Sequence, residues 1–215
     1  MASFYQSTIG KKVVVAVTGL ILVGFVFVHL LGNLQVFLGA AVVNDYAVFL
    51  RSKPGFLWLT RIVLLISVLL HIINTVQLRR RNKDSRPIPY INQENIQANL
   101  ASRTLFWGGL FLAVYIVYHL LHFTWGSVHP DFSHTDIYGN MVKGFSVWYV
   151  SAFYILGMVA LGFHLYHGVW SVFQTLGFNH PKWNVARRAF ATVVSVGIAV
   201  GYIFIPVSVM VGILK

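Results

Sequence analysis

The sequence predicts an all-α integral membrane protein: a bundle of five transmembrane helices with its N terminus in the cytoplasm. The first observation is composition, because 57% of the 215 residues are hydrophobic and only 10% are charged, which gives a mean hydropathy of +0.72. The second is that apolar residues form five runs of at least about 18 residues, the length that crosses a bilayer. The third is that lysine and arginine concentrate on one side of these runs.

The five predicted spans lie at about 13–38, 57–78, 104–125, 147–175 and 189–213. The first run is not a cleaved signal peptide, because it is too long and no small-residue cleavage site follows it. Pro206 lies inside the fifth span, where membrane helices tolerate proline. Little chain remains outside the spans, so we expect a single membrane domain that covers 1–215.

The segments between the spans predict two kinds of connection. Residues 78–97 contain a charge run and two prolines, which favours a cytoplasmic loop. Residues 39–56 and 126–140 lie on the opposite side, and the loop histidines His129 and His134 are expected to be solvated. Gly177 closes the fourth span, which is typical of a helix C terminus.

The cations indicate the orientation. Eleven of the 16 lysines and arginines fall on the side of the N terminus: Lys11, Lys12, Arg79, Arg80, Arg81, Lys83, Arg86, Arg103, Lys182, Arg187 and Arg188. The other five are Arg51, Lys53, Arg61, Lys143 and Lys215. The positive-inside rule therefore predicts that the N terminus and the loop 79–103 lie in the cytoplasm. We expect a multi-pass protein of the inner (cytoplasmic) membrane. The basic face either only sets topology and meets anionic lipid, or it also docks a soluble partner.

Histidines occur within four of the predicted spans. An α-helix rises about 1.5 Å per residue, so counting from the cytoplasmic charges places His29 about 25 Å and His119 about 24 Å deep. By the same rise His71 lies about 12 Å deep, with His164 at about 19 Å and His167 at about 15 Å. The histidines therefore form two tiers. His29 and His119 lie in the outer tier, and His71 with either His164 or His167 lies in the inner one.

Two imidazoles that face each other at one depth can hold a haem iron from both sides. Each tier would then bind one haem. His122 follows His119 by three residues in "YHLLHF" and is the alternate ligand to it. The chain has no cysteine, which excludes thiolate metal sites, disulfides and iron–sulfur clusters held by cysteine of this chain.

Three other interpretations compete with the haem hypothesis. Each histidine could simply hydrogen-bond across helices. A proton or ion transporter usually carries carboxylates within its spans, whereas the five acids here fall in loops: Asp45, Asp84, Glu94, Asp131 and Asp136. A zinc site built from His119, His122 and His29 would leave the inner tier unexplained.

Three stretches resemble a known family. They are "STIGKKVVVAVTGLILVGFVFVHLLGNLQVF" (7–37), "SRTLFWGGLFLAVYIVYHLLHF" (102–123) and "GFHLYHGVWSVFQTLG" (162–177). They are similar to the first, third and fourth helices of the single-chain, five-helix, di-haem cytochrome b membrane anchors of succinate:quinone oxidoreductases, which comprise succinate dehydrogenase and fumarate reductase. The resemblance covers almost the whole chain.

The resemblance implies a ligand set for two b-type haems. The family pairs helix one with helix three and helix two with helix four, which gives His29 with His119 for the outer haem and His71 with His164 for the inner haem. In the family the fourth-helix ligand is followed four residues later by glycine, which selects His164, whereas depth alone favours His167. His122 and His167 remain the alternates.

The resemblance also implies partners. A flavoprotein subunit and an iron–sulfur subunit would bind the cytoplasmic face, and electrons would pass between the iron–sulfur subunit and membrane quinone, either menaquinone or ubiquinone. Alone, the chain would not act on succinate. No nucleic-acid partner is expected, and the oligomeric state stays open. The alternatives are another di-haem quinone-reactive cytochrome b with a different soluble partner, or a histidine-based transporter. Ser67 and Asn74, close to His71, are candidates to hydrogen-bond near the inner haem, although back-bonding to their own helix is the favoured explanation for both.

Overall fold

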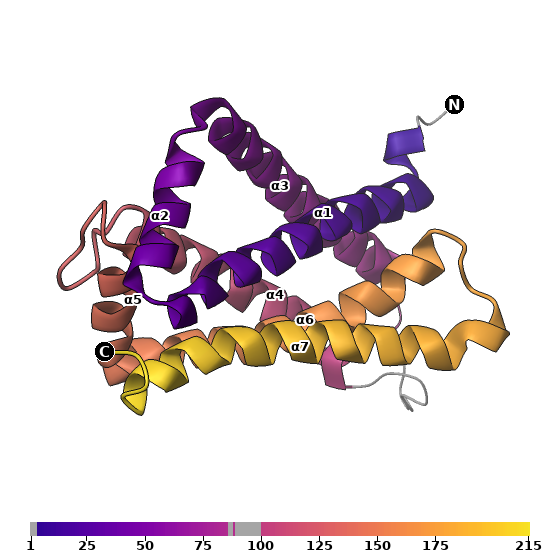
Figure 1. Cartoon of the computed structure of the whole chain (residues 1–215). Coiled ribbons are helices and arrows are strands. Elements are labelled where there is room, and N and C mark those ends of the chain that lie inside the picture. The colour runs from indigo at the N-terminus through magenta and orange to yellow at the C-terminus, as the bar shows by residue number, and fades with distance from the viewer. Residues whose placement is uncertain (1–3, 86–87, 89–99) are drawn as a thin grey trace.

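A computed structural model of the chain describes residues 4–85, 88 and 100–215 (Figure 1). Within these ranges all regular secondary structure is helical. The elements in chain order are η1 Phe4–Gln6, α1 Thr8–Leu34, η2 Gln35–Leu38, α2 Ala40–Arg51, α3 Pro54–Asp84, α4 Leu100–His119, η3 Leu120–Thr124, α5 Ile137–Ser146, α6 Trp148–Thr175, η4 Pro181–Trp183 and α7 Asn184–Met210. The element η3 is a π-helical turn that continues α4 directly.

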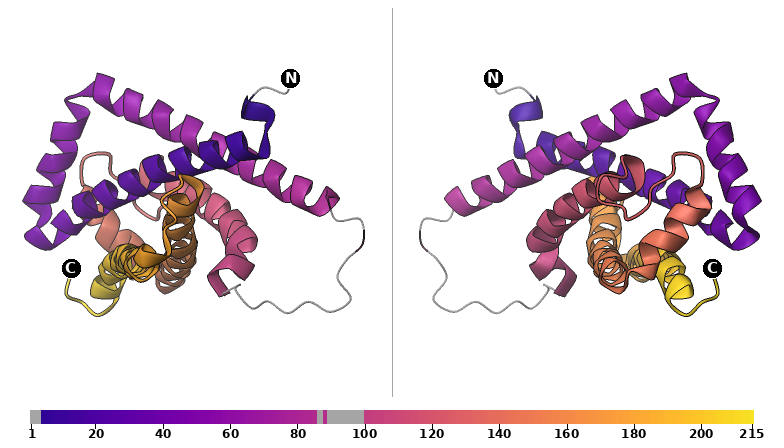
Figure 2. Two further views of the ribbon diagram at one scale, coloured as in Figure 1. Left: turned by 90° about the vertical axis from the view of Figure 1, so that its right-hand side faces the viewer. Right: turned by 90° about the vertical axis from the view of Figure 1, so that its left-hand side faces the viewer.

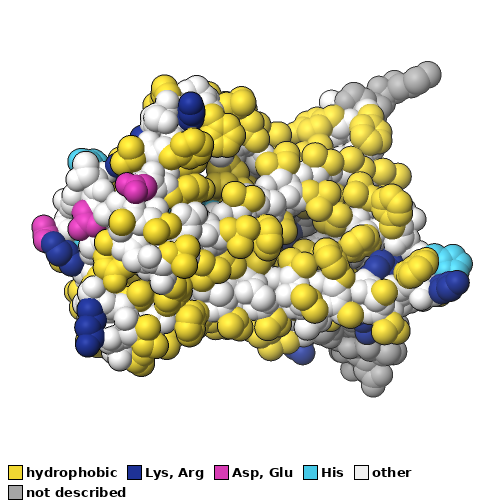
Figure 3. All heavy atoms as spheres, viewed as in Figure 1, with side chains coloured by type: hydrophobic (Ala, Val, Ile, Leu, Met, Phe, Trp, Pro, Cys, Tyr) yellow, Lys and Arg dark blue, Asp and Glu magenta, His cyan; other side chains and the backbone are white. Residues whose placement is uncertain are grey.

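Five helical segments in the described part of the chain are long and apolar enough to cross a membrane, which confirms the predicted number. They cover Thr8–Leu38, Pro54–Asp84, Leu100–Thr124, Trp148–Thr175 and Pro181–Met210. In the space-filling view, hydrophobic side chains spread over the flank of the molecule, whereas the charged side chains gather towards its ends (Figure 3). A bundle whose sides meet lipid acyl chains has this distribution.

The helices extend beyond the apolar runs that predicted them. α1 begins at Thr8 because the Ser7 hydroxyl accepts a hydrogen bond from the Gly10 N–H at 2.9 Å and so caps the helix. α3 begins at Pro54, a residue favoured at the first helical position, and it continues to Asp84. Backbone hydrogen bonds thus carry both helices into polar sequence, where hydropathy gives no signal.

The two connections opposite the N terminus contain helices, α2 and α5, that the sequence did not predict. Asn44 of α2 joins them, because its Oδ1 accepts hydrogen bonds from the backbone N–H groups of Ile137 at 2.8 Å and Tyr138 at 3.1 Å. Asp136 caps α5 by accepting from the Gly139 N–H at 2.9 Å. These bonds satisfy N–H groups that a helix N terminus leaves unpaired.

One loop prediction is wrong. His129 was expected to be solvated, and it is only 9% exposed. Its Nδ1 accepts a hydrogen bond from the Asp131 N–H at 3.1 Å, and its Nε2–H donates to the Asn140 carbonyl at 2.9 Å. A polar loop sequence does not show which backbone groups will bond to the imidazole. These hydrogen bonds, which form only on folding, offset the cost of burying the ring. His134 is exposed, as expected.

The long helices form two pairs, α1 with α3 and α4 with α6, and α7 lies along α6 (Figure 2). The pairs meet mainly where α1 contacts α6. In contrast, α1 and α4 are not closely packed, nor are α3 and α6. η1, the end of α3 and η4 lie at one end of the bundle, whereas α2, α5 and the C terminus lie at the other (Figure 1). Arg86, one of the predicted cytoplasmic cations, lies outside the described residues.

The centre of the bundle is where α1, α6 and α7 meet. Leu30, Leu165 and Ile198 form a buried cluster there. A Cβ atom on Gly201 would lie 2.9 Å from Leu30 Cδ2, so glycine permits this close approach of α7 to α1. The Tyr202 hydroxyl adds a hydrogen bond of 2.8 Å to the backbone carbonyl of Val26. This packing fixes α1 relative to α6, and therefore positions the histidines that the two helices carry.

Candidate functional site

Two pairs of histidine rings meet between the helices. His29 of α1 faces His119 of α4, with ring centroids 6.0 Å apart and an interplanar angle of 79°. His71 of α3 faces His164 of α6, with centroids 6.2 Å apart and an angle of 57°. Depth along the helices predicted the first pairing, and for the second it placed both His164 and His167 in the inner tier while favouring His167. The structure brings His164 to His71, and within the described residues no ring contact joins His167 to His71.

The spacing of each pair fits two imidazoles that share one metal ion. A metal–imidazole bond is about 2 Å long, and a ring nitrogen lies about 1.1 Å from its ring centre given ordinary bond lengths. Two rings bound to one ion from opposite sides would therefore have centroids about 6.2 Å apart. The observed separations of 6.0 and 6.2 Å agree with this value.

The donor set matches haem better than a bare metal ion. A structural zinc site needs four protein ligands and a catalytic site three. No group of three or more histidine, cysteine, aspartate or glutamate residues able to hold a metal occurs in the described ranges. A haem brings four ring nitrogens of its own and asks the protein only for axial ligands. The hypothetical zinc site of His29, His119 and His122 is therefore not assembled.

The pairs also join helices that are not closely packed. The first pair bridges α1 to α4 and the second bridges α3 to α6, and neither of these combinations is closely packed. A flat macrocycle held between two imidazoles separates the helices that carry them. The histidines therefore lie where a large cofactor would require the helices to be spread.

Thr18 determines which nitrogen of His71 is available. Its Oγ1 lies 3.2 Å from His71 Nδ1, and its own hydroxyl proton is donated to the Val14 carbonyl at 2.7 Å. The hydroxyl must then accept from His71, so Nδ1 carries the proton and Nε2 keeps its lone pair. A second partner that orients a ligating histidine in this way is typical of metal-binding imidazoles.

Tyr154 plays the corresponding part in the other pair. Its hydroxyl lies 3.4 Å from His119 Nδ1 and 3.0 Å from His122 Nδ1. If Nε2 of His119 is the ligating atom, its Nδ1–H donates to Tyr154, and Tyr154 donates to His122. Ligation through Nε2 would thus set the direction of the chain His119–Tyr154–His122, with His119 donating to Tyr154 and Tyr154 donating to His122.

The two histidines of "YHLLHF" have different surroundings. His119 faces His29, whereas His122 is fully buried and stacks on His129 with ring centroids 4.8 Å apart. The Nε2 atom of His122 has no hydrogen-bond partner in the described part of the chain. The π-helical turn starts at Leu120, between the two histidines. As the alternate ligand, His122 is thus not placed opposite His29.

Sequence reasoning did not find Thr18 or Tyr154. Both lie on a different helix from the histidine that they contact, and no local spacing marks such a pair. Of the neighbours that the sequence did suggest, Asn74 donates from Nδ2 to the Leu70 carbonyl at 2.8 Å. That bond is back-bonding within its own helix.

Outside the apolar helices, hydrogen bonds favour the charged form of two carboxylates, those of Asp136 and Asp131. The pKa of Asp136 lies below its ordinary value because the Gly139 N–H and then the Asn44 side chain donate to it, and Lys143 adds a smaller attraction. Asp131 also has a lowered pKa, owing first to its hydrogen bond with Lys143 and then to the charge of that lysine. Both aspartates lie at the end of the bundle that carries α5.

Comparison with protein-family models, with curated proteins and with solved structures finds no match to this chain.

Proposed function

We propose that this chain is a di-haem membrane cytochrome b that serves as the quinone-reactive anchor of a succinate:quinone oxidoreductase. The observation that carries the proposal is the presence of two imidazole pairs, with centroids 6.0 and 6.2 Å apart, across helices that are not otherwise packed. His29 and His119 would hold the outer haem, and His71 and His164 the inner one. Bound haem supplies reversible one-electron chemistry.

The protein's own contribution is to hold and orient the ligands. Thr18 keeps the proton of His71 on Nδ1, so this ring presents the lone pair of Nε2. Tyr154 can accept the Nδ1 proton of His119, which would leave Nε2 of that ring as the ligating atom. Such partners raise the basicity of an imidazole ligand. The apolar sides of the bundle exclude water, which tunes the reduction potential of a buried centre.

The two sites lie at different heights along the bundle. On α1, Thr18 contacts the inner pair and His29 belongs to the outer pair. These residues are eleven positions apart, so the sites are separated by about 16 Å of helix. On α4, Gly109 lies beside His164 and His119 follows ten positions later, which gives about 15 Å. Two independent helices thus give the same separation.

The orientation follows from charge. The N-terminal end of the bundle carries the larger share of the cations, so the positive-inside rule favours a cytoplasmic location for this end. We propose the cytoplasmic membrane as the location of the chain. An iron–sulfur subunit and a flavoprotein subunit would dock there, because the chain has no cysteine for clusters of its own. Electrons would then pass between the iron–sulfur subunit and membrane quinone, towards quinone in succinate oxidation and in the reverse direction during fumarate reduction.

The test is haem content per chain, measured with oxidised and reduced visible spectra on detergent-purified protein from haem-replete cells. We expect two low-spin b-type haems. A single haem would mean that one pair is wrongly assigned. Absence of haem would overturn the proposal and favour a histidine-based transporter. Co-purification of flavin-containing and iron–sulfur subunits separates the succinate:quinone oxidoreductase anchor from a di-haem cytochrome with another partner.

A further inference from the structure

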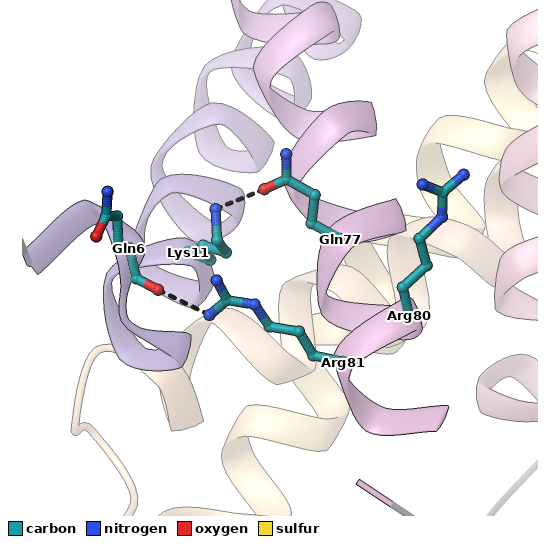
Figure 4. A pocket seen from close by; sticks show the side chains of 5 residues that line it. All are labelled: Gln6, Lys11, Gln77, Arg80 and Arg81. Atoms are coloured by element: carbon teal, nitrogen blue, oxygen red, sulfur yellow. Dashed lines mark hydrogen bonds between the residues drawn. The ribbon is translucent and has the colours of Figure 1, made fainter. Parts of the chain in front are cut away.

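A basic hollow of about 460 Å³ lies between α1 and α3 at the N-terminal end of the bundle (Figure 4). Three cations and two amides line it: Gln6, Lys11, Gln77, Arg80 and Arg81. No acidic side chain is among these residues. We propose that this hollow, called here the α1–α3 basic site, binds the phosphate of an anionic membrane lipid. The proposal is independent of the haem assignment.

The N-terminal turn closes one side of the site. η1 folds back on α1, with the Ser7 N–H donating to the Phe4 carbonyl at 3.0 Å. A Cβ atom on Gly10 would lie 2.0 Å from that same carbonyl oxygen, so only glycine allows the turn to lie so close to the helix. The turn presents the Gln6 carbonyl to α3, where Arg81 Nη1 donates to it at 2.7 Å.

Lys11 is the residue that points to a ligand. Its side chain is buried, at 5% exposure. Its ammonium donates to Gln77 Oε1 and lies 4.7 Å from the centre of the Tyr5 ring. Neither partner carries a negative charge, and an ammonium offers three N–H donors. A buried cation is costly unless it is paired with an anion, and an anion in the hollow would provide that pairing.

The location favours a lipid phosphate over a free one. Lys11 lies in the first turns of α1, and Gln77 to Arg81 follow the apolar part of α3, so the site lies where the apolar flank meets the polar end. Phosphate headgroups occupy this level of a membrane, and basic pockets between transmembrane helices on the cytoplasmic side bind them. Guanidinium groups such as those of Arg80 and Arg81 suit phosphate because their donors match its oxygens.

Apolar surface beside the site can receive the acyl chains. Phe4, in the same η1 turn as Gln6, is 66% exposed, and Ile73, one turn of α3 before Gln77, is 46% exposed. A free phosphate ion would make no use of such side chains. A lipid has a charged headgroup and hydrocarbon chains, and a cationic hollow beside exposed apolar side chains can bind both parts.

The test is native mass spectrometry of the full chain, released from nanodiscs of phosphatidylcholine with a minor share of phosphatidylglycerol. We expect the wild type to retain phosphatidylglycerol selectively. Lys11→Gln and Arg80→Gln should each lower its retention about fivefold, the effect of about one cation at a membrane surface. Arg80 is exposed, so its substitution should not disturb folding even if that of buried Lys11 does. Lys12→Gln is the matched control, because Lys12 is the exposed neighbour with the same charge.

Four results would overturn the proposal. The first is equal retention of phosphatidylcholine, and the second is an equal loss with Lys12→Gln, which would indicate general surface attraction. The third is full displacement of the lipid by millimolar inorganic phosphate, which would indicate a site for the free ion. The fourth is unchanged lipid retention in Lys11→Gln together with a shifted haem potential, which would assign the cations to the carboxylates of a haem.

Discussion

The Thr18 hydroxyl lies 3.2 Å from Nδ1 of His71, and its own proton is already donated to the Val14 carbonyl. This single contact fixes the tautomer of a half-buried histidine from a neighbouring helix. It leaves Nε2 as the nitrogen that can bind a metal, on a ring whose centre is 6.2 Å from that of His164.

Thr18→Val should raise the reduction potential of the inner haem. Loss of the acceptor makes His71 a weaker electron donor, which disfavours the oxidised iron. We expect an increase of about 20–60 mV, the one-electron equivalent of the net contribution of one hydrogen bond. A redox titration followed by visible spectra measures it. Thr18→Ser keeps the hydroxyl and should leave the potential close to that of the wild type. Equal potentials in all three proteins would show that the contact does not act on the haem.

Single alanine substitutions should remove the haems separately. His71→Ala removes one of two axial ligands and should abolish or convert the inner low-spin signal, and His29→Ala should do the same to the outer signal. Haem content per chain and low-temperature spectra of the reduced protein measure both. His167→Ala, which leaves the His71–His164 contact in place, is the control and should keep both signals. Retention of both haems in His71→Ala or in His29→Ala would refute the ligand assignment.

Comparison of His119→Ala with His122→Ala should separate the ligand from its neighbour. His119 faces His29, so its loss should eliminate the outer haem signal. His122 stacks on His129 instead, so its loss should preserve both haems while lowering thermal stability. Haem spectra recorded before and after heating give both quantities. The reverse pattern would make His122 the ligand.

Tyr154→Phe should destabilise the protein and alter only the outer haem. The substitution leaves the Nδ1 atom of fully buried His122 without a partner, which costs about 1–3 kcal/mol. It also removes the contact to His119. Thermal unfolding and electron paramagnetic resonance of the two haems test these effects. Tyr149→Phe is the control, since Tyr149 is 62% exposed. A changed inner signal with an unchanged outer signal would contradict the proposed link.

The Asp136 cap should make stability depend on pH. Its folded pKa lies below the ordinary value of 3.8, so the stabilisation is present above that value and disappears as pH falls through the folded pKa. Asp136→Asn should therefore melt at a lower temperature than wild type at about pH 6, and the difference should shrink at about pH 3. Asp84→Asn removes the same charge at the opposite end and is the control. A difference that does not vary with pH would show that charge is not what the cap contributes.

The number of long helices and their apolar character could be predicted from the sequence. Five long apolar runs specify five such helices because the hydropathy of a span is a property of its own residues. Depth along a helix is equally local, since each residue adds a fixed rise, and this was enough to place His29 with His119 in one tier and His71 in another. The helices α2 and α5 could not be predicted in the same way, because they depend on contacts such as those from Asn44 to the start of α5.

The pairing of the histidines within a tier, and the side chains that hydrogen-bond to them, could be seen only in the tertiary structure. His164 and His167 are both within reach by depth, and it is the rotation of α6 against its neighbours that turns His164 to His71. Thr18, Tyr154 and the burial of His129 depend on side chains that meet across helices or loops, at distances no spacing rule encodes. A helix fixes the height of a side chain through its own backbone, whereas the direction in which the side chain points becomes fixed only when the helices pack.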